Sequence, residues 1–177
     1  MAQGFLDERS RRMLGGALRV RSAGTWSRPG YAATDEAVAA AAERGVDIAE
    51  HRSTPFDPGQ ADWADLVVTM TAEQRDEVHE ASPEAGPKTF TLKELVALLG
   101  ALPPPEGEPS RDGLLARVAE AHELREGGTG PRPVDEDVAD PLGLGMEAYR
   151  ATCWEIEELI DAAVRGLAGE RVPAEEG

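Results

Sequence analysis

The sequence predicts an α/β domain in which a parallel β-sheet is flanked by helices. Short strand-like segments alternate with helical ones, and the apolar segments at 66–70 and 88–90 are each followed at once by a helix-start signal. Strands that alternate with helices pair in parallel through right-handed crossover connections. With 177 residues and a hydrophobic content of 41%, the chain suits one such domain, which we expect to span residues 1–168.

Helices are expected before, between and after the strands. Apolar residues recur at helical spacing over residues 2–14, and Gly15 then ends the pattern. A second helix is expected over residues 35–44, with Thr34 as its N-cap and Gly45 at its end. The apolar positions of a long final helix recur three or four residues apart: Met146, Tyr149, Cys153, Ile156, Ile160, Ala163 and Leu167.

Three strands are expected, and their patterns differ. Residues 17–23 alternate, with Arg19 and Arg21 on one side, which predicts an edge strand with one solvated face. Residues 66–70 are apolar on both faces, as in a central parallel strand. A short strand is expected around residues 88–90.

Two capping boxes indicate the helices that follow the second and third strands. Thr71 precedes Gln74, and Thr91 precedes Glu94, at the spacing at which each side chain bonds the other residue's backbone N–H. Trp63, just before the apolar strand, is expected in the core.

The composition changes at residues 101–133, where prolines and paired glycines bracket a short helix. Such punctuation is typical of an insertion or a mobile flap rather than of a second domain. Residues 169–177 are expected to form a frayed acidic tail.

The charge and the cysteine content exclude several classes of function. A net charge of -16 argues against nucleic-acid and anionic-membrane partners, which require clustered Lys and Arg. No apolar run approaches the roughly 18 residues of a membrane span, and no secretory signal opens the chain. One cysteine allows no intramolecular disulfide and indicates a reducing compartment, so a cytoplasmic location is expected.

The three side chains that most suggest chemistry have simple structural explanations. Cys153 lies in mid-helix on the apolar stripe, without a Gly-rich turn or a following Arg, so a buried inert thiol is expected. His79 and His122 have no Cys or carboxylate partner at ligand spacing. No metal or other cofactor is therefore expected.

Five fragments in order resemble the low-molecular-weight protein-tyrosine-phosphatase family. They lie at residues 20–25, 45–53, 64–71, 88–95 and 138–150. The resemblance implies a flavodoxin-like fold of the phosphotyrosine phosphatase I type, with the strand order two-one-three-four.

Residues 1–6, Met-Ala-Gln-Gly-Phe-Leu, resemble the stretch that follows the phosphate-binding loop Cys-x5-Arg-Ser-Pro of that family. The resemblance therefore implies that the first, central strand and this loop, with its nucleophile, precede residue 1. We expect residues 17–23 and 66–70 to lie too far apart to pair, and the chain as written to be inactive. An error in the assigned start site is the expected cause.

The same resemblance implies roles for four side chains. Asp140 would be the general acid, held extended by the proline that follows it, although an Asp-Pro pair alone indicates only a turn. Trp26 would line the substrate crevice, its alternative being a hydrophobic plug in a loop. Ser22 and His51 would hydrogen-bond and orient the phosphate loop. Leu142 departs from the aromatic residue that the family often has there.

The implied activity is that of a protein-tyrosine-phosphatase that acts on a phosphorylated protein through a cysteinyl-phosphate. Three alternatives stay open. A protein arginine phosphatase has the same fold, and residues 88–95 resemble bacterial enzymes of that type. A non-catalytic module would bind phosphoproteins without hydrolysing them. An arsenate reductase ranks last, because its thiol relay needs further cysteines.

Overall fold

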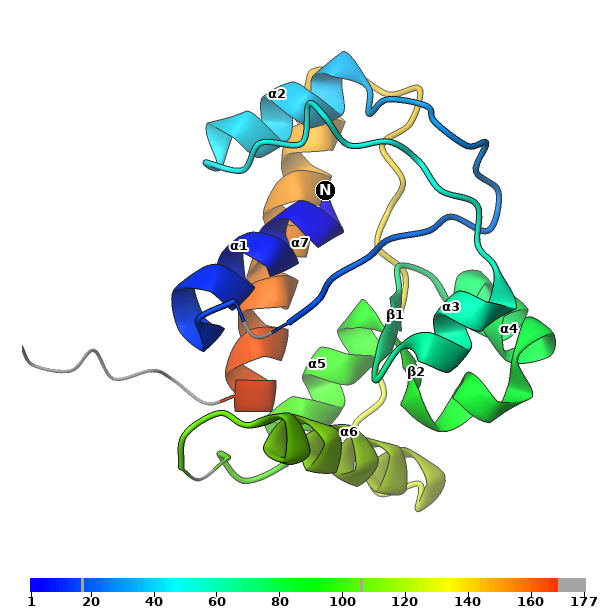
Figure 1. Cartoon of the computed structure of the whole chain (residues 1–177), viewed down its shortest axis with the longest axis vertical. Helices are drawn as coiled ribbons and strands as arrows, with labels where there is room; N and C mark the ends of the chain where they lie inside the picture. Colours follow the sequence, from blue (N-terminus) through cyan, green and yellow to red (C-terminus); the bar gives the residue numbers. More distant parts are fainter. Residues whose placement is uncertain (17, 106, 169–177) are drawn as a thin grey trace, which may run out of the picture.

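A computed structural model of the chain describes residues 1–16, 18–105 and 107–168, and the predicted acidic tail lies outside this part. The elements follow in the order α1 (Ala2–Leu14), α2 (Asp35–Glu43), α3 (Pro58–Trp63), β1 (Val67–Thr69), α4 (Ala72–Ala81), the 3-10 helix η1 (Pro83–Lys88), β2 (Thr89–Thr91), α5 (Leu92–Ala101), α6 (Arg111–Glu126) and α7 (Met146–Ala168). Figure 1 shows α1 and α7 on one side of the short strands, with α3 and α4 on the other.

The strands β1 and β2 form a parallel pair in which Val67 lies opposite Thr89 and Thr69 opposite Thr91. The connection between them runs through α4 and η1. A parallel pair joined through helices confirms the predicted α/β class, with a small sheet flanked by helices.

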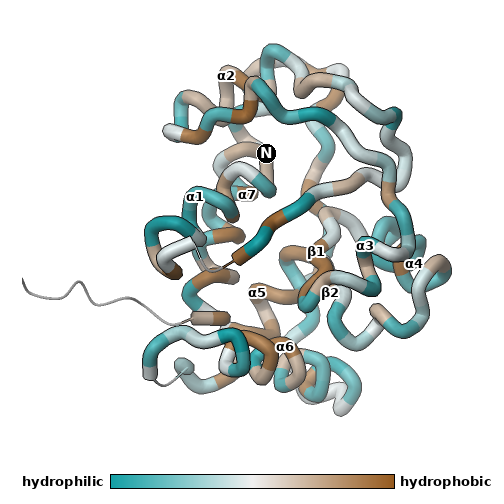
Figure 2. The backbone as a smooth tube through the Cα atoms, viewed as in Figure 1, coloured by the Kyte–Doolittle hydropathy of each residue, from teal (hydrophilic) through white to brown (hydrophobic). Residues whose placement is uncertain are grey.

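The predicted edge strand is not a strand over residues 18–23, the part of it that the structure describes. Its alternation of apolar and charged residues is present, as Figure 2 shows along this segment. No ladder joins the segment to β1, and the first bridge is an isolated one between Gly24 and Pro55. A strand assignment requires a hydrogen-bonded neighbour, and this segment has none among the described residues.

The core lies among α1, α5, α7 and β2. Phe5 of α1, Phe90 of β2 and Cys153 of α7 are fully buried, as are the leucines on one face of α5. Figure 2 shows mostly hydrophobic residues along α5, in contrast to the mostly hydrophilic residues of α4. None of the described helices has both the length and the apolar character needed to cross a membrane.

Only one half of each predicted capping box forms. The Thr71 hydroxyl accepts the N–H of Gln74 at 3.2 Å, and the Thr91 hydroxyl accepts that of Glu94 at 3.1 Å. The reciprocal bonds are missing, because Gln74 accepts the N–H of Met70 at 3.0 Å and Glu94 forms ion pairs instead. The helix starts were predicted correctly, but the side-chain partners were not.

The prediction that Trp63 lies in the core is wrong. Its side chain is 43% exposed, and the guanidinium of Arg21 lies 4.4 Å from the ring centroid, with that of Arg19 at 5.7 Å. Trp63 ends α3, whose complete capping box between Asp57 and Gln60 was not predicted. Stacking on guanidinium groups explains how a large ring is accommodated at the surface.

The inserted segment contributes the helix α6, which packs against α5, α7 and η1. From this helix Arg125 donates to the carbonyl oxygens of Thr89 at 2.7 Å and Gly86 at 2.9 Å, and it lies over the Phe90 ring. The two accepting carbonyl groups belong to the first residue of β2 and to η1, which precedes it. The described part of the insertion is thereby attached to the sheet.

Candidate active site

A cleft of about 1010 Å³ lies beside β1. Residues 18–23, β1 and side chains of α7 all line it. Apolar side chains from these elements make up most of the lining, among them Leu18, Val20, Val68, Met70, Ile156 and Ile160. The cleft thus exposes one edge of β1 and a large apolar surface.

Three of the four predicted site residues line this cleft. Ser22 comes from the segment after α1, His51 from the loop after α2, and Asp140 from the loop before α7. Met70 and Thr71, the two residues that follow β1, also line the cleft. In open parallel sheets, ligands bind where strands end in loops, so these residues lie where a site is expected.

Asp140 is exposed, and one of its carboxylate oxygens accepts the N–H of Leu142 at 2.9 Å. This bond forms the local turn that an Asp-Pro pair predicts. The backbone just before it is fixed, because Val138 N–H donates to the Met70 carbonyl at 2.8 Å. The Thr152 hydroxyl also donates to the Ala139 carbonyl at 3.2 Å. Asp140 therefore has a defined place relative to β1.

Ser22 and His51 are placed by separate contacts. The Ser22 hydroxyl donates to the Gln3 side chain at 2.6 Å, which ties the cleft wall to the start of α1. Partial burial, followed by nearby positive charge that includes Arg52, lowers the pKa of His51. A neutral imidazole has one donor and one acceptor nitrogen, so His51 is suited to hydrogen bonding within the cleft.

Trp26 lies outside the cleft, although its neighbour Thr25 lines it. Its ring is 88% exposed, so it is not the hydrophobic plug considered as an alternative. The indole N–H donates to Glu77 of α4 at 2.9 Å, a contact that the sequence did not predict. This bond fixes the ring at the surface, and its role in binding substrate stays a prediction.

Cys153 is completely buried on α7, as the sequence predicted. Burial raises the pKa of its thiol, so little thiolate is present at neutral pH. A buried thiol with a raised pKa is not an activated nucleophile.

The peptide that carries Cys153 is therefore expected to resist alkylation at pH 7 in the native protein and to react fully after denaturation, as mass spectrometry would measure. Because burial raises the folded-state pKa of this thiol, stability is unaffected while the thiol is protonated in both states and falls as the pH rises above the pKa of the unfolded thiol. Rapid native alkylation at Cys153 would contradict its structural role.

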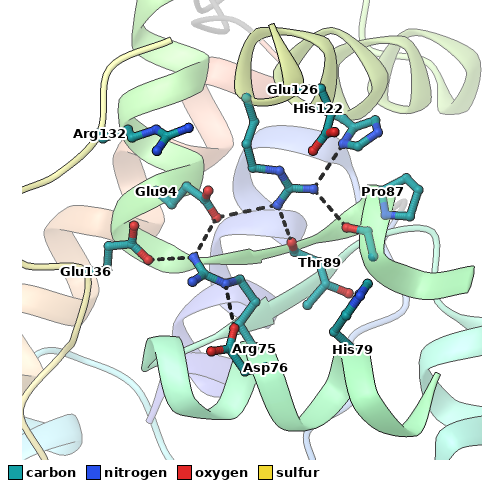
Figure 3. A pocket seen from close by; sticks show the side chains of 12 residues that line it. Arg75, Asp76, His79, Pro87, Thr89, Glu94, His122, Glu126, Arg132 and Glu136 are labelled. Atoms are coloured by element: carbon teal, nitrogen blue, oxygen red, sulfur yellow. Dashed lines mark hydrogen bonds and ion pairs between the residues drawn. The ribbon is translucent and has the colours of Figure 1, made fainter. Parts of the chain in front are cut away.

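A second cavity, of about 580 Å³, lies beside Thr89 of β2 and is shown in Figure 3. His79 and His122 both line it, together with arginine and carboxylate side chains. The Arg125 guanidinium lies 3.0 Å from Nδ1 of His122, and because arginine only donates, that nitrogen is the acceptor. No group of three or more potential metal ligands occurs among the described residues.

Comparisons with known proteins identify related sequences and structures. A family described as low molecular weight phosphotyrosine protein phosphatase matches residues 1–105. The protein-arginine-phosphatase of Geobacillus stearothermophilus is 32% identical over 154 residues, which are 87% of this chain and 80% of that protein. The family match ends inside the insertion, so the loop that bears Asp140 lies beyond it.

Two solved structures share the fold over most of the chain. YwlE arginine phosphatase from Geobacillus stearothermophilus has a TM-score of 0.67 at 30% identity, with 94% of this chain and 82% of that one covered. The low molecular weight protein tyrosine phosphatase from T. tengcongensis has the same TM-score of 0.67 at 29% identity, with 94% and 88% covered. The fold alone therefore does not separate the two substrate classes.

Proposed function

The chain belongs to the low molecular weight phosphotyrosine protein phosphatase family, and we propose that it carries the general acid of a protein phosphatase. Asp140 is that acid. The observation that carries this proposal is that Ser22, His51 and Asp140 all line one cleft beside β1. These side chains come from three separate segments, and the family resemblance assigns each of them a role in phosphate transfer.

We place the nucleophile in a segment that precedes Met1 and runs through the cleft. An extended apolar strand there would pair with the open edge of β1 and with residues 18–23, and it would cover the apolar lining. The start of α1 also lines the cleft, and a helix N-terminus attracts phosphate. A Cys-x5-Arg loop between that strand and α1 would lie beside Ser22 and His51.

Two proton transfers by Asp140 would complete the reaction. The thiolate attacks phosphorus and forms an S–P bond as the bond to the leaving atom breaks, and protonated Asp140 gives that atom its proton. Asp140, now a carboxylate, takes a proton from the water that attacks the cysteinyl-phosphate. Phosphate leaves, the thiolate is restored, and the loop arginine stabilises the oxygens in both steps.

Phosphoarginine on a protein is the substrate class that we favour. Support comes from the arginine phosphatase that is 32% identical over 87% of this chain. The exposed ring of Trp26 would stack on a guanidinium group. Phosphotyrosine is the second candidate, since the same ring packs on an aromatic side chain and the T. tengcongensis tyrosine phosphatase has the same TM-score of 0.67. The single buried cysteine fits a reducing compartment, so we place the protein in the cytoplasm.

The protein encoded by the full reading frame tests this proposal. It is expected to hydrolyse p-nitrophenyl phosphate, and its kcat/KM for a phosphoarginine peptide should exceed that for the matched phosphotyrosine peptide by roughly tenfold or more. The opposite preference would establish the second candidate. Absence of turnover with all three substrates would contradict the phosphatase assignment.

A further inference from the structure

The segment before Asp140, residues 135–139, is tied down along its whole length. At its end, the Val138 N–H donates to the Met70 carbonyl at 2.8 Å, and the Val138 side chain is buried. In its middle, the Asp137 carboxylate accepts the N–H of Ala72, the first residue of α4, at 2.8 Å. We call residues 135–139 the strap, because they connect the insertion to the acid loop across β1 and α4.

Lys93 of α5 binds the strap from one side. Its ammonium group donates to the Asp137 carbonyl at 2.5 Å and to Glu155 of α7 at 2.9 Å, and it lies 3.6 Å from the Asp135 carboxylate. Partial burial opposes its charge, but Glu155 and Asp135 outweigh that effect and raise the pKa of Lys93. Lys93 is therefore a permanent cation that joins α5, α7 and the strap.

Arg75 of α4 binds the strap from the other side, within the pocket of Figure 3. Its guanidinium donates to Glu136 at 2.5 Å and lies 3.5 Å from the buried carboxylate of Glu94. Glu94 is shared with Arg125 of α6, at 3.6 Å. The carboxylates of this pocket are mostly paired with its own arginines, which favours a structural lock over a ligand site.

We propose that Lys93, with Arg75, is a positioning residue for the general acid Asp140. This inference rests on the proposed function. Lys93 reaches the main chain three residues before the acid, and Arg75 holds the residue next to that contact. Proton transfer requires the acid within hydrogen-bond reach of the leaving atom, so a displaced strap weakens this step without changing substrate binding.

The test replaces Lys93 by Met, which keeps most of the length of the side chain and removes its charge. Hydrolysis is compared for two esters. The leaving group of phenyl phosphate is as basic as tyrosine, with a pKa of about 10, and the leaving group of p-nitrophenyl phosphate is more acidic. For Lys93→Met, kcat/KM, which reports only the step that releases the leaving group, should fall roughly tenfold with phenyl phosphate and much less with p-nitrophenyl phosphate. Lys93→Arg should restore most of the loss, because arginine also donates to the carbonyl and the carboxylates.

Amide hydrogen exchange of the same proteins gives a readout that needs no activity. Exchange at Val138 should accelerate by roughly tenfold in Lys93→Met. Lys88→Met is the matched control, since Lys88 also donates to two backbone carbonyls, of Asp62 and Ala64, away from the strap. It should leave exchange at Val138 unchanged.

Two outcomes would overturn the inference. One is equal loss of kcat/KM with both phosphate esters, which would indicate a general structural role of Lys93. The other is unchanged exchange at Val138 in Lys93→Met. If the parent protein shows no phosphatase activity, the proposed function fails, and the exchange measurement still decides whether Lys93 holds the strap.

Discussion

The isolated 177-residue chain is expected to unfold without a sharp cooperative transition above about 50 °C. The open edge of β1 and the apolar lining of the cleft are the physical reason. A strand through the cleft would bury four or five apolar side chains, each worth about 1.5–3 kcal/mol, and the total of roughly 6–15 kcal/mol equals the stability of an ordinary domain. Circular dichroism and calorimetry during heating measure this directly.

The matched control is the same protein with the residues that the reading frame encodes before Met1. It should melt cooperatively, with a higher midpoint and less binding of a dye that reports exposed apolar surface. A sharp melt of the 177-residue chain above about 50 °C would show that the cleft needs no strand.

Replacing Asp140 by Ala in the full-length phosphatase is expected to lower kcat by roughly 10²–10⁴. The leaving group then departs without a proton, and no base activates the water that hydrolyses the cysteinyl-phosphate. Steady-state kinetics with p-nitrophenyl phosphate, together with detection of the trapped intermediate by mass spectrometry, measure both losses. KM should fall together with kcat, because slow hydrolysis of the cysteinyl-phosphate lets this intermediate accumulate.

Asp112→Ala serves as the control for this substitution, because Asp112 is an exposed carboxylate in the first turn of α6. Its removal should leave kcat within about twofold of the parent value, as for other surface substitutions. Unchanged turnover in Asp140→Ala would remove Asp140 from the role of general acid.

The sequence predicted most of the helices and the parallel sheet because those features depend on local patterns, but it did not predict α3 or η1. Thr34, Thr71 and Thr91 each cap a helix where their spacing indicated. The burial of Cys153 followed from its place on an apolar helical stripe. Residues 18–23 did not form the predicted strand, since alternation shows which side chains share a face but not whether a neighbouring strand is present.

The contacts that define the site could not be predicted in this way. Trp26 bonds to Glu77, which lies 51 positions later, and Lys93 reaches Asp137, 44 positions later. Trp63 is held at the surface by Arg21. Such pairs are set by how the elements pack, and no local spacing in the sequence indicates them.

The nucleotide sequence directly upstream of the Met1 codon tests the central claim, that a strand and a phosphate-binding loop complete this cleft. We expect it to encode, in frame, an apolar strand of a few residues followed by Cys-x5-Arg-Ser-Pro. That result would place the nucleophile at the start of α1, beside Ser22 and His51. An in-frame stop codon close upstream would contradict the claim and would indicate a phosphoprotein-binding module that performs no hydrolysis.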